Sequence, residues 1–395
     1  MLADPRTTGL TRWSAATVFA YPFRIFFLSA ASLAVLLVPA WLLMLLGGWQ
    51  WPLALPAPAW HQHEMLFGFL QAAIAGFLLT AVSAWTGTQR LHALPLLALW
   101  LLWLVGRLLM LTGAALPPVI VLAVDLAFLP LVMLDFSWRV LRARQYRQLL
   151  VLAVLGGFWL MDLGFHLYPG GTSAHTALLL AMLLMLVIGG RITPAFSSNW
   201  LRLQGLDASP IRVIPALERA LLASMLVVLA VELWPAGPAL RASAALVAAG
   251  LVAMRLLLWR GWLVRAEPLL WILHLALAWI PVALLLLAGS AMGWVAPTAW
   301  VHAVGTGAVG ALILGVMSRV ALGHTGRPLQ LPPGMTTAFV LVLIAGLVRV
   351  ATATSLLPWR LGVSIAAGLW IAAYLIFLFR YWSVLSRPRL DGKPG

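Results

Sequence analysis

Long apolar runs of about 20 residues recur along the whole chain, and short polar connections separate them. Each run forms a helix long enough to cross the hydrocarbon core of a bilayer. The pattern therefore predicts an all-α fold, a polytopic transmembrane bundle of about twelve helices. The runs lie at residues 24–46, 62–84, 93–112, 118–138, 148–167, 174–194, 212–234, 240–260, 268–290, 299–321, 335–355 and 361–383.

Arginine residues are concentrated in alternate connections between the predicted helices. Because basic residues are retained on the cytoplasmic side, this asymmetry predicts cytoplasmic termini and an even number of spans. The predicted layout is a cytoplasmic segment at 1–23, a twelve-helix transmembrane domain at 24–383 and a cytoplasmic tail at 384–395. The poorer connections hold only Arg241 and Arg360, and the richer connections and tails hold Arg6, Arg12, Arg90, Arg139, Arg142, Arg144, Arg147, Arg191, Arg202, Arg212, Arg260, Arg265, Arg319, Arg327, Arg387, Arg389 and Lys393.

Composition agrees with a membrane protein. Hydrophobic residues make up 63% of the 395 positions and charged residues only 9%, too few for the surface of a soluble protein. The formal charge of +15 would suit nucleic-acid binding, but the basic residues lie at the predicted membrane edges. The expected partner is therefore the lipid bilayer and not nucleic acid. No small-residue cleavage site follows the first apolar run, so we expect that run to remain as an anchor.

Histidines cluster at one predicted membrane depth. Cysteine is absent, so any metal must be held by histidine, carboxylate or methionine side chains. Imidazole is a common ligand of copper, zinc and haem iron, and polar groups inside a bilayer often mark function. We predict a metal or haem role for at least two of His61, His63, His166 and His302. Five histidines fall on the predicted outer side and three elsewhere: His61, His63, His166, His175 and His302, then His92 and His324 in cytoplasmic connections and His274 within the ninth helix.

The spacing of His61 and His63 leaves two arrangements open. Residues two apart on an α-helix point roughly 200° away from each other. Either the two rings serve different partners, or the chain is extended at His61 and both rings reach one metal. Glu64 is a candidate acceptor that fixes an imidazole tautomer, or simply a first-turn carboxylate favoured by the helix dipole.

Four charged residues lie within predicted helices on the same outer side. One interpretation is that they pair with one another, since an unpaired charge at that depth is costly. The other is that the two arginines hold anionic groups of a cofactor, such as haem propionates. The residues are Arg107, Asp125, Asp162 and Arg349.

The chain carries signs of an internal repeat and of close helix packing. His63, His175 and His302 each open a predicted helix, which is compatible with three pseudo-repeats of four helices. Glycine and alanine recur four residues apart after His63 and His302, a pattern that lets helices approach closely. Residues 189–199 and 318–328 combine glycine, arginine and hydroxyl residues, and we expect them to form irregular cytoplasmic connections.

In the five segments given at the end of this paragraph, which are spread nearly from end to end, the chain resembles the NnrS family of bacterial membrane proteins. Phe23-Arg24-Ile25-Phe26-Phe27 departs from the family's pattern by isoleucine in place of proline, and Asp162 stands where the family has asparagine. The segments that carry the resemblance are Trp60-His61-Gln62-His63-Glu64-Met65-Leu66-Phe67-Gly68-Phe69, Gly189-Gly190-Arg191-Ile192-Thr193-Pro194-Ala195-Phe196, His302, Gly323-His324-Thr325-Gly326-Arg327-Pro328 and Arg389-Leu390-Asp391-Gly392-Lys393-Pro394-Gly395.

The resemblance implies haem and copper as cofactors, and a role in nitric oxide metabolism or nitrosative-stress defence. It places the protein in the bacterial inner (plasma) membrane, with nitric oxide or a related small molecule and an electron donor as partners. It favours His63 and His302 as cofactor-binding residues, and the buried arginines Arg107 and Arg349 are the candidates to bind the anionic groups of the cofactor. Its candidate metal ligands are His61, His63, His166, His302, His274 and His324.

Three functions remain open at this point. The leading one is a haem- and copper-binding protein with redox activity toward nitric oxide at a site near the periplasmic face. The alternative is a transporter or exporter of a metal or small solute, for which the predicted inner half offers only Asp135, Glu218 and His274 as polar groups. The third is a structural subunit, for which substitution of His63 or His302 would change nothing.

Overall fold

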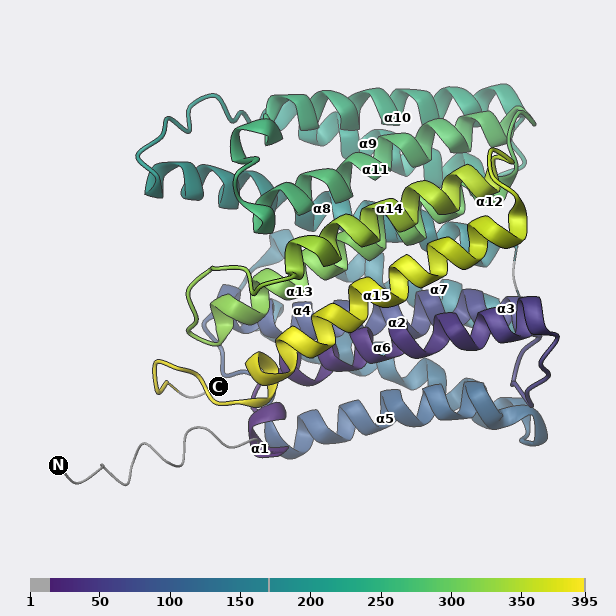
Figure 1. Cartoon of the computed structure of the whole chain (residues 1–395), viewed down its shortest axis with the longest axis horizontal. Coiled ribbons are helices and arrows are strands. Elements are labelled where there is room, and N and C mark those ends of the chain that lie inside the picture. The colour runs from purple at the N-terminus through teal and green to yellow at the C-terminus, as the bar shows by residue number, and fades with distance from the viewer. Residues whose placement is uncertain (1–14, 170, 394–395) are drawn as a thin grey trace. The chain divides into compact units, whose positions relative to one another are not determined.

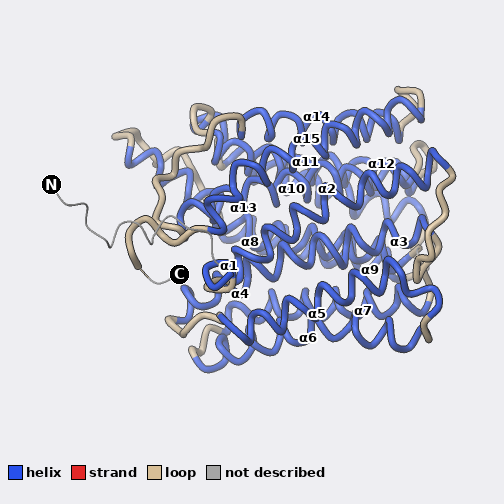
Figure 2. Tube along the Cα trace, turned by 60° about the horizontal axis from the view of Figure 1, so that its bottom comes forward, coloured by secondary structure: helices blue, strands red, loops and turns tan. Residues whose placement is uncertain are grey.

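A computed structural model describes residues 15–169 and 171–393 of the chain. Every regular element within these ranges is a helix (Figures 1 and 2). The predicted all-α class is therefore confirmed. Arg6 and Arg12, which contributed to the predicted charge asymmetry, lie outside the described residues, as do Pro394 and Gly395.

Among the described residues, twelve long helices account for the apolar runs. Many begin with proline in the first turn, where its missing N–H costs no hydrogen bond. In chain order they are α2 (Pro22–Gly47), the continuous α3 (Ala57–His63), η1 (Glu64–Leu70) and α4 (Gln71–Thr86), α5 (Ala93–Thr112), α6 (Pro118–Arg142), α7 (Leu149–Leu167), α8 (Thr172–Leu203), α9 (Pro215–Leu233), α10 (Pro238–Leu258), α11 (Pro268–Ala291), the continuous α12 (Pro297–His302), η5 (Ala303–Val309) and α13 (Gly310–His324), α14 (Met335–Ala353) and α15 (Trp359–Ser386).

Eleven of these helices, within the described ranges, are long and apolar enough to cross a membrane. The remaining one, α9, carries the charged residues Glu218, Arg219 and Glu232. Its two carboxylates are both paired with neighbouring arginines: Glu218 lies 3.3 Å from Arg255, and Glu232 pairs with Arg241. This pairing lowers the cost of charge in a helix that packs against α10.

The chain forms two compact units, which we describe separately. Unit 1 comprises the described residues within 1–170, 316–335 and 374–395, and unit 2 those within 171–315 and 336–373. In unit 1, α2 packs against α4, and α6 packs against α4, α5 and α7. In unit 2, α11 packs against α8, α10, α12 and η5.

The predicted irregular segment at 189–199 is wrong, because α8 continues through it to Leu203. Its glycines are explained by packing. A Cβ atom at Gly190 would collide with the guanidinium of buried Arg255, which donates a 2.8 Å hydrogen bond to the carbonyl of Leu186. The second predicted segment, 318–328, is also largely helical, since α13 runs to His324 and the chain turns only at Gly326 (φ 65°).

Arg24 of α2 stabilises the far end of the chain within unit 1. This arginine is fully buried, and its guanidinium donates hydrogen bonds to the carbonyls of Leu385 and Arg387, both 2.8 Å long. These carbonyls lie at the C-terminus of α15, where helical carbonyls have no intrahelical partner. Arg24 therefore caps the C-terminus of α15.

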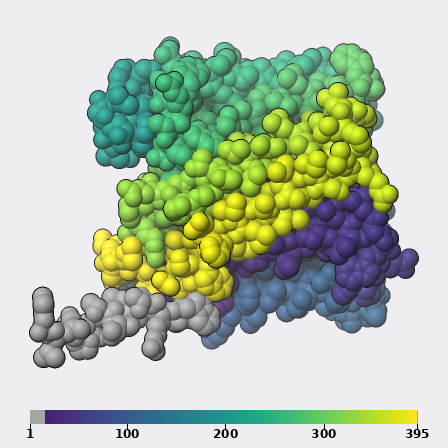
Figure 3. Space-filling model, viewed as in Figure 1, coloured from purple at the N-terminus to yellow at the C-terminus, as the bar shows by residue number. Residues whose placement is uncertain are grey.

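The outer surface is strongly apolar. The C-terminal helix α15, yellow in Figure 3, contributes Phe379 and Trp382, which are 78% and 52% exposed. Side chains of this kind are stable in contact with lipid tails, whereas a soluble protein rarely exposes so many of them. The surface therefore agrees with a multi-pass membrane protein.

Candidate metal centre

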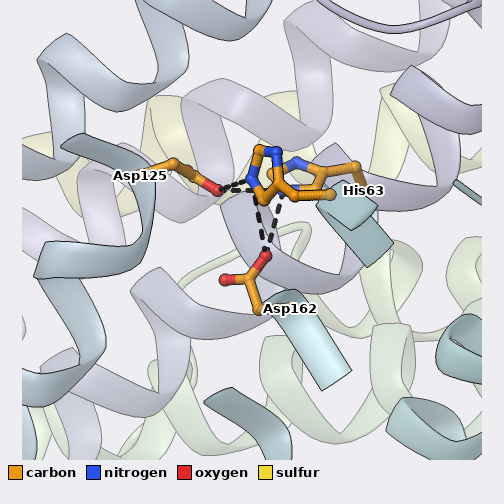
Figure 4. Close-up of side chains that lie close together, drawn as sticks. His63, Asp125 and Asp162 are labelled. Atoms are coloured by element: carbon orange, nitrogen blue, oxygen red, sulfur yellow. Dashed lines mark hydrogen bonds and ion pairs between the residues drawn. The ribbon is translucent and has the colours of Figure 1, made fainter. Parts of the chain in front are cut away.

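Four side chains from three helical segments of unit 1 converge on one point (Figure 4). His63 Nε2 lies 3.0 Å from Asp125 Oδ2 and 3.1 Å from Asp162 Oδ1. His166 Nε2 lies 2.8 Å from Asp125 Oδ2 and 4.0 Å from Asp162 Oδ1. One ligand atom from each residue lies within 4.8 Å of all the others. We call this set of His63, Asp125, Asp162 and His166 the metal cluster.

The helices bring the metal cluster together near one of their ends. Asp162 and His166 are four residues apart on α7, so they lie on one face close to its C-terminus. Asp125 is about two turns into α6. His63 is the last residue of α3, and the π-helix η1 follows it directly. Single π-turns within helices are uncommon and frequently accompany functional sites.

The tautomer of His63 follows from its neighbours. Glu64 Oε1 lies 3.1 Å from Nδ1 of His63, and an ionised carboxylate can only accept, so Nδ1 carries the proton. Nε2 faces carboxylate oxygens of Asp125 and Asp162, which likewise can only accept, so either a second proton or a bound cation must lie between Nε2 and these oxygens. Nε2 of His166 approaches the same oxygens. Electron-pair donors therefore surround one point and require a positive charge among them.

A second layer of polar groups holds the carboxylates in place. Arg107 donates to Glu64 Oε1 at 2.5 Å and also pairs with Asp125 Oδ1. Gln71 Nε2 donates to Asp162 Oδ2 at 3.2 Å. Gly68 leaves room for this layer, since a Cβ atom there would lie 3.1 Å from Arg107 Nη1. Such outer contacts orient metal ligands and raise their basicity.

The charges in this region do not balance without a cation. The carboxylates of Glu64, Asp125 and Asp162 face a single guanidinium, that of Arg107, so neutral imidazoles leave two negative charges in excess. All three carboxylates are at most 3% exposed. An excess of buried charge at this depth is expensive, and a divalent cation would cancel it.

Aromatic rings enclose the metal cluster on one side. The rings of Phe67 and Phe165 lie 5.2 and 5.7 Å from the His63 ring, and Phe158 packs against Phe67 at 5.1 Å. All three phenylalanines are at most 2% exposed. They lower the local dielectric constant and exclude water, which strengthens electrostatic interactions inside the site.

His61 does not join the metal cluster. Both His61 and His63 lie in α3, so their rings point in different directions. The His61 ring stacks on Trp41 with a centroid distance of 4.7 Å and an interplanar angle of 6°. Of the two arrangements left open by the sequence, the structure thus has the one in which the two rings serve different partners.

The three remaining predicted histidines each lie in a separate setting. His274 in unit 2 is 2.9 Å from the hydroxyl of Ser197. His302 in unit 2 donates from Nδ1 to the carbonyl of Thr298 at 2.8 Å. His324 in unit 1 packs against Phe23, with ring centroids 5.7 Å apart. None of the three belongs to the metal cluster.

The buried charges divide between the two interpretations offered by the sequence. Arg107 and Asp125 pair with each other, so Arg107 is committed to carboxylates of its own chain. Arg349 in unit 2 has no such pairing among the described residues. Sequence reasoning noted Asp125 and Asp162 only as charges and missed Gln71. The spacing of Asp162 and His166, one helical turn apart, was the available signal for a joint site.

Comparison with known proteins identifies the family. The family model described as NnrS protein matches residues 17–389, nearly the whole chain. No curated protein matches. The chain belongs to the NnrS family, as its motifs suggested.

Proposed function

We propose that this NnrS-family protein is a membrane metalloprotein that holds one divalent transition-metal ion at His63, Asp125, Asp162 and His166. The observation that carries the proposal is the convergence of four buried electron-pair donors, two of them imidazole nitrogens, with the other nitrogen of His63 turned toward Glu64. Ligands bonded at 2.0–2.1 Å to one ion lie roughly 3.0–3.4 Å apart. The shortest separations in the metal cluster, 2.8 to 3.1 Å, are close to that range.

The donor set limits the choice of metal. Two imidazoles and two carboxylates suit iron(II), manganese, zinc or copper(II), whereas copper(I) prefers sulfur ligands. Copper, which the resemblance to the family implied, would therefore be bound here in its oxidised state. When bound, such an ion offers an open coordination position to a small molecule.

Haem, the other implied cofactor, does not fit at His63. A histidine that holds haem iron needs one ring nitrogen directed at the iron, but Nδ1 of His63 faces Glu64 and its Nε2 faces Asp125 and Asp162. His302 would fit this role better. Its Nδ1 donates to a backbone carbonyl, which leaves Nε2 as the basic nitrogen. If this protein binds haem, we place the iron at His302.

We assign the metal cluster to nitric oxide metabolism or nitrosative-stress defence in the bacterial inner membrane, with both termini in the cytoplasm. The side chains have distinct parts in this role. Glu64 fixes the tautomer of His63, while Gln71 and Arg107 hold the carboxylates, and the surrounding phenylalanines keep water away.

The test is metal analysis of the full-length protein purified in detergent, treated with chelator and reloaded with iron(II), manganese, zinc or copper(II). We expect stoichiometric binding to the wild type, weakened at least about tenfold by Asp125→Asn or His166→Gln. Asp135→Asn is the matched control. Asp135 lies further along the same helix and pairs with Arg139 at 2.7 Å, so its loss should not affect the metal.

Each competing account predicts a different result. If two protonated imidazoles balance the charge of the carboxylates, the wild type binds none of these metals in a stoichiometric amount. If the protein is a transporter, proteoliposomes accumulate the metal and the Asp125→Asn variant does not. A nitric oxide role is supported by a nitrosyl electron paramagnetic resonance signal on the iron(II)-loaded wild type that Asp125→Asn abolishes, and its absence counts against that role.

A further inference from the structure

The region around His302 repeats the region around His63 at one constant offset in the sequence. His63 corresponds to His302, Gly68 to Gly307, Gly76 to Gly315 and Gly87 to Gly326. The π-helices match at the same offset, since η1 spans Glu64–Leu70 and η5 spans Ala303–Val309. Gly87 and Gly326 both adopt a φ of 65° after the helix. A shared π-turn in two long helices is strong evidence for duplication, because such turns are rare.

Each repeated helix also packs on the helix before it in the same way. A Cβ atom at Gly76 would lie 2.9 Å from Phe27 of α2, and one at Gly315 would lie 2.9 Å from Ile272 of α11. Both preceding helices contain an internal proline, Pro39 in α2 and Pro281 in α11. We therefore treat the two stretches α2–α5 and α11–α14 as copies of one arrangement. His175 opens α8 without a π-turn, so it does not share this feature.

The helix that follows the repeat supplies an arginine in both copies, Arg107 from α5 and Arg349 from α14. In unit 2, a Cβ atom at Gly346 of α14 would lie 3.0 Å from Gly307, so these two helices touch there. His302 precedes Gly307, and Arg349 follows Gly346 by about one turn. Because successive spans run in opposite directions, both displacements lead toward the same end of the helices.

Arg349 lies on the buried face of α14. Met335, Ala338, Val342 and Ala345 are all fully buried, and Arg349 continues their helical spacing. Its guanidinium nevertheless has neither an ion pair nor a hydrogen bond within the part of the chain that the structure describes. The position that corresponds to Glu64 is Ala303 in this copy. At the same offset Arg107 corresponds to Gly346, and Arg349 lies three residues beyond it, so the second copy has an arginine near this level and no carboxylate at the Glu64 position.

We propose that Arg349, at the level of His302, forms a second ligand site that takes an anionic oxygen group, either a carboxylate or a small inorganic oxyanion. A half-buried guanidinium without a counter-charge favours an anion, and planar two-oxygen anions fit its donors in bidentate fashion. The site is separate from the metal cluster. The same chemistry has two sources, a free anion or a carboxylate carried by a larger cofactor.

The first arm of the test measures the binding of radiolabelled formate to the full-length protein in detergent by equilibrium dialysis. We expect saturable binding to the wild type that Arg349→Gln weakens at least about tenfold, since a charge-assisted contact is lost. Arg349→Lys keeps the charge but not the planar donors, so it should bind with intermediate affinity, and it also serves if the glutamine variant does not fold. Arg360→Gln, which removes an arginine from the exposed start of α15, is the control for charge alone.

The second arm titrates the protein with haem and with haem dimethyl ester, which lacks free carboxylates, and follows the absorbance of the bound form. If the anion belongs to a cofactor, Arg349→Gln weakens haem binding but not ester binding. The proposal is overturned if Arg349→Gln changes neither formate nor haem binding, or if Arg360→Gln weakens them equally. Asp125→Asn should leave both arms unchanged, so failure of the metal cluster and failure of this site are distinguishable.

Discussion

The segments around His63 and His302 share a backbone and differ in charge. In each segment a histidine precedes a π-turn, a glycine of the π-turn contacts the next long helix, and that next helix carries an arginine. Around His63, three carboxylates surround one guanidinium and create a cation site. Around His302, alanine replaces Glu64 and the guanidinium stands without a carboxylate. Under the two proposals above, the repeated backbone arrangement would bind ligands of opposite charge because of a difference in few side chains.

The largest effect on metal binding is expected when carboxylates around His63 are removed, so that this region resembles the region around His302. Glu64→Ala combined with Asp125→Ala removes a metal ligand, releases the His63 tautomer and leaves Arg107 without its two carboxylates. We expect metal affinity to fall at least about a hundredfold. A second class of formate site should appear in dialysis. Unchanged metal binding in this variant would contradict both the site and the comparison.

The reverse conversion tests whether Arg349 lies within reach of the duplicated site. Ala303→Glu places a carboxylate at the position that corresponds to Glu64, in a fully buried environment. Alone it should be tolerated if Arg349 pairs with it, whereas with Arg349→Met it becomes an unpaired buried charge. We expect a coupling free energy of about 1–3 kcal/mol in a double-mutant cycle of unfolding. Independent, additive effects would place the two side chains apart.

The repeated glycines should respond differently to alanine. At Gly307 a Cβ atom would overlap the ring of Trp279, so Gly307→Ala should destabilise the protein by about 1–3 kcal/mol. At Gly68 the nearest groups are side-chain ends of Arg107, Glu64 and Leu33, each 3.1 Å away, which can shift slightly. Gly68→Ala should therefore cost less in unfolding free energy but weaken metal binding by displacing Arg107. Equal unfolding costs would argue against this distinction.

Much of the fold was predictable because apolar run length is a local property of the chain. The depth of His63, His166, Asp125 and Asp162 followed from it. The predictions that failed concern features that depend on contacts between residues far apart in the sequence. Gly190 resembles a turn signal, yet it is a glycine because the side chain of Arg255 occupies the space above it. Likewise no local pattern decided whether the chain is helical or extended at His61, so the divergence of the His61 and His63 rings required the structure.

The smallest effect is expected at His61, and it separates the two histidines of one short helix. Its ring stacks on Trp41 and not on the metal cluster, so His61→Phe preserves the stacking and should leave metal content at the wild-type level. The free energy of unfolding should change by less than about 0.5 kcal/mol, because the aromatic stack on Trp41 is retained. His63→Phe is the matched variant and should lose the metal, because it removes a nitrogen ligand and leaves Glu64, Asp125 and Asp162 without their shared partner. Comparable metal loss in both variants would show that His61 also serves the ion, and the divergence of the two rings along α3 would then not describe the loaded protein.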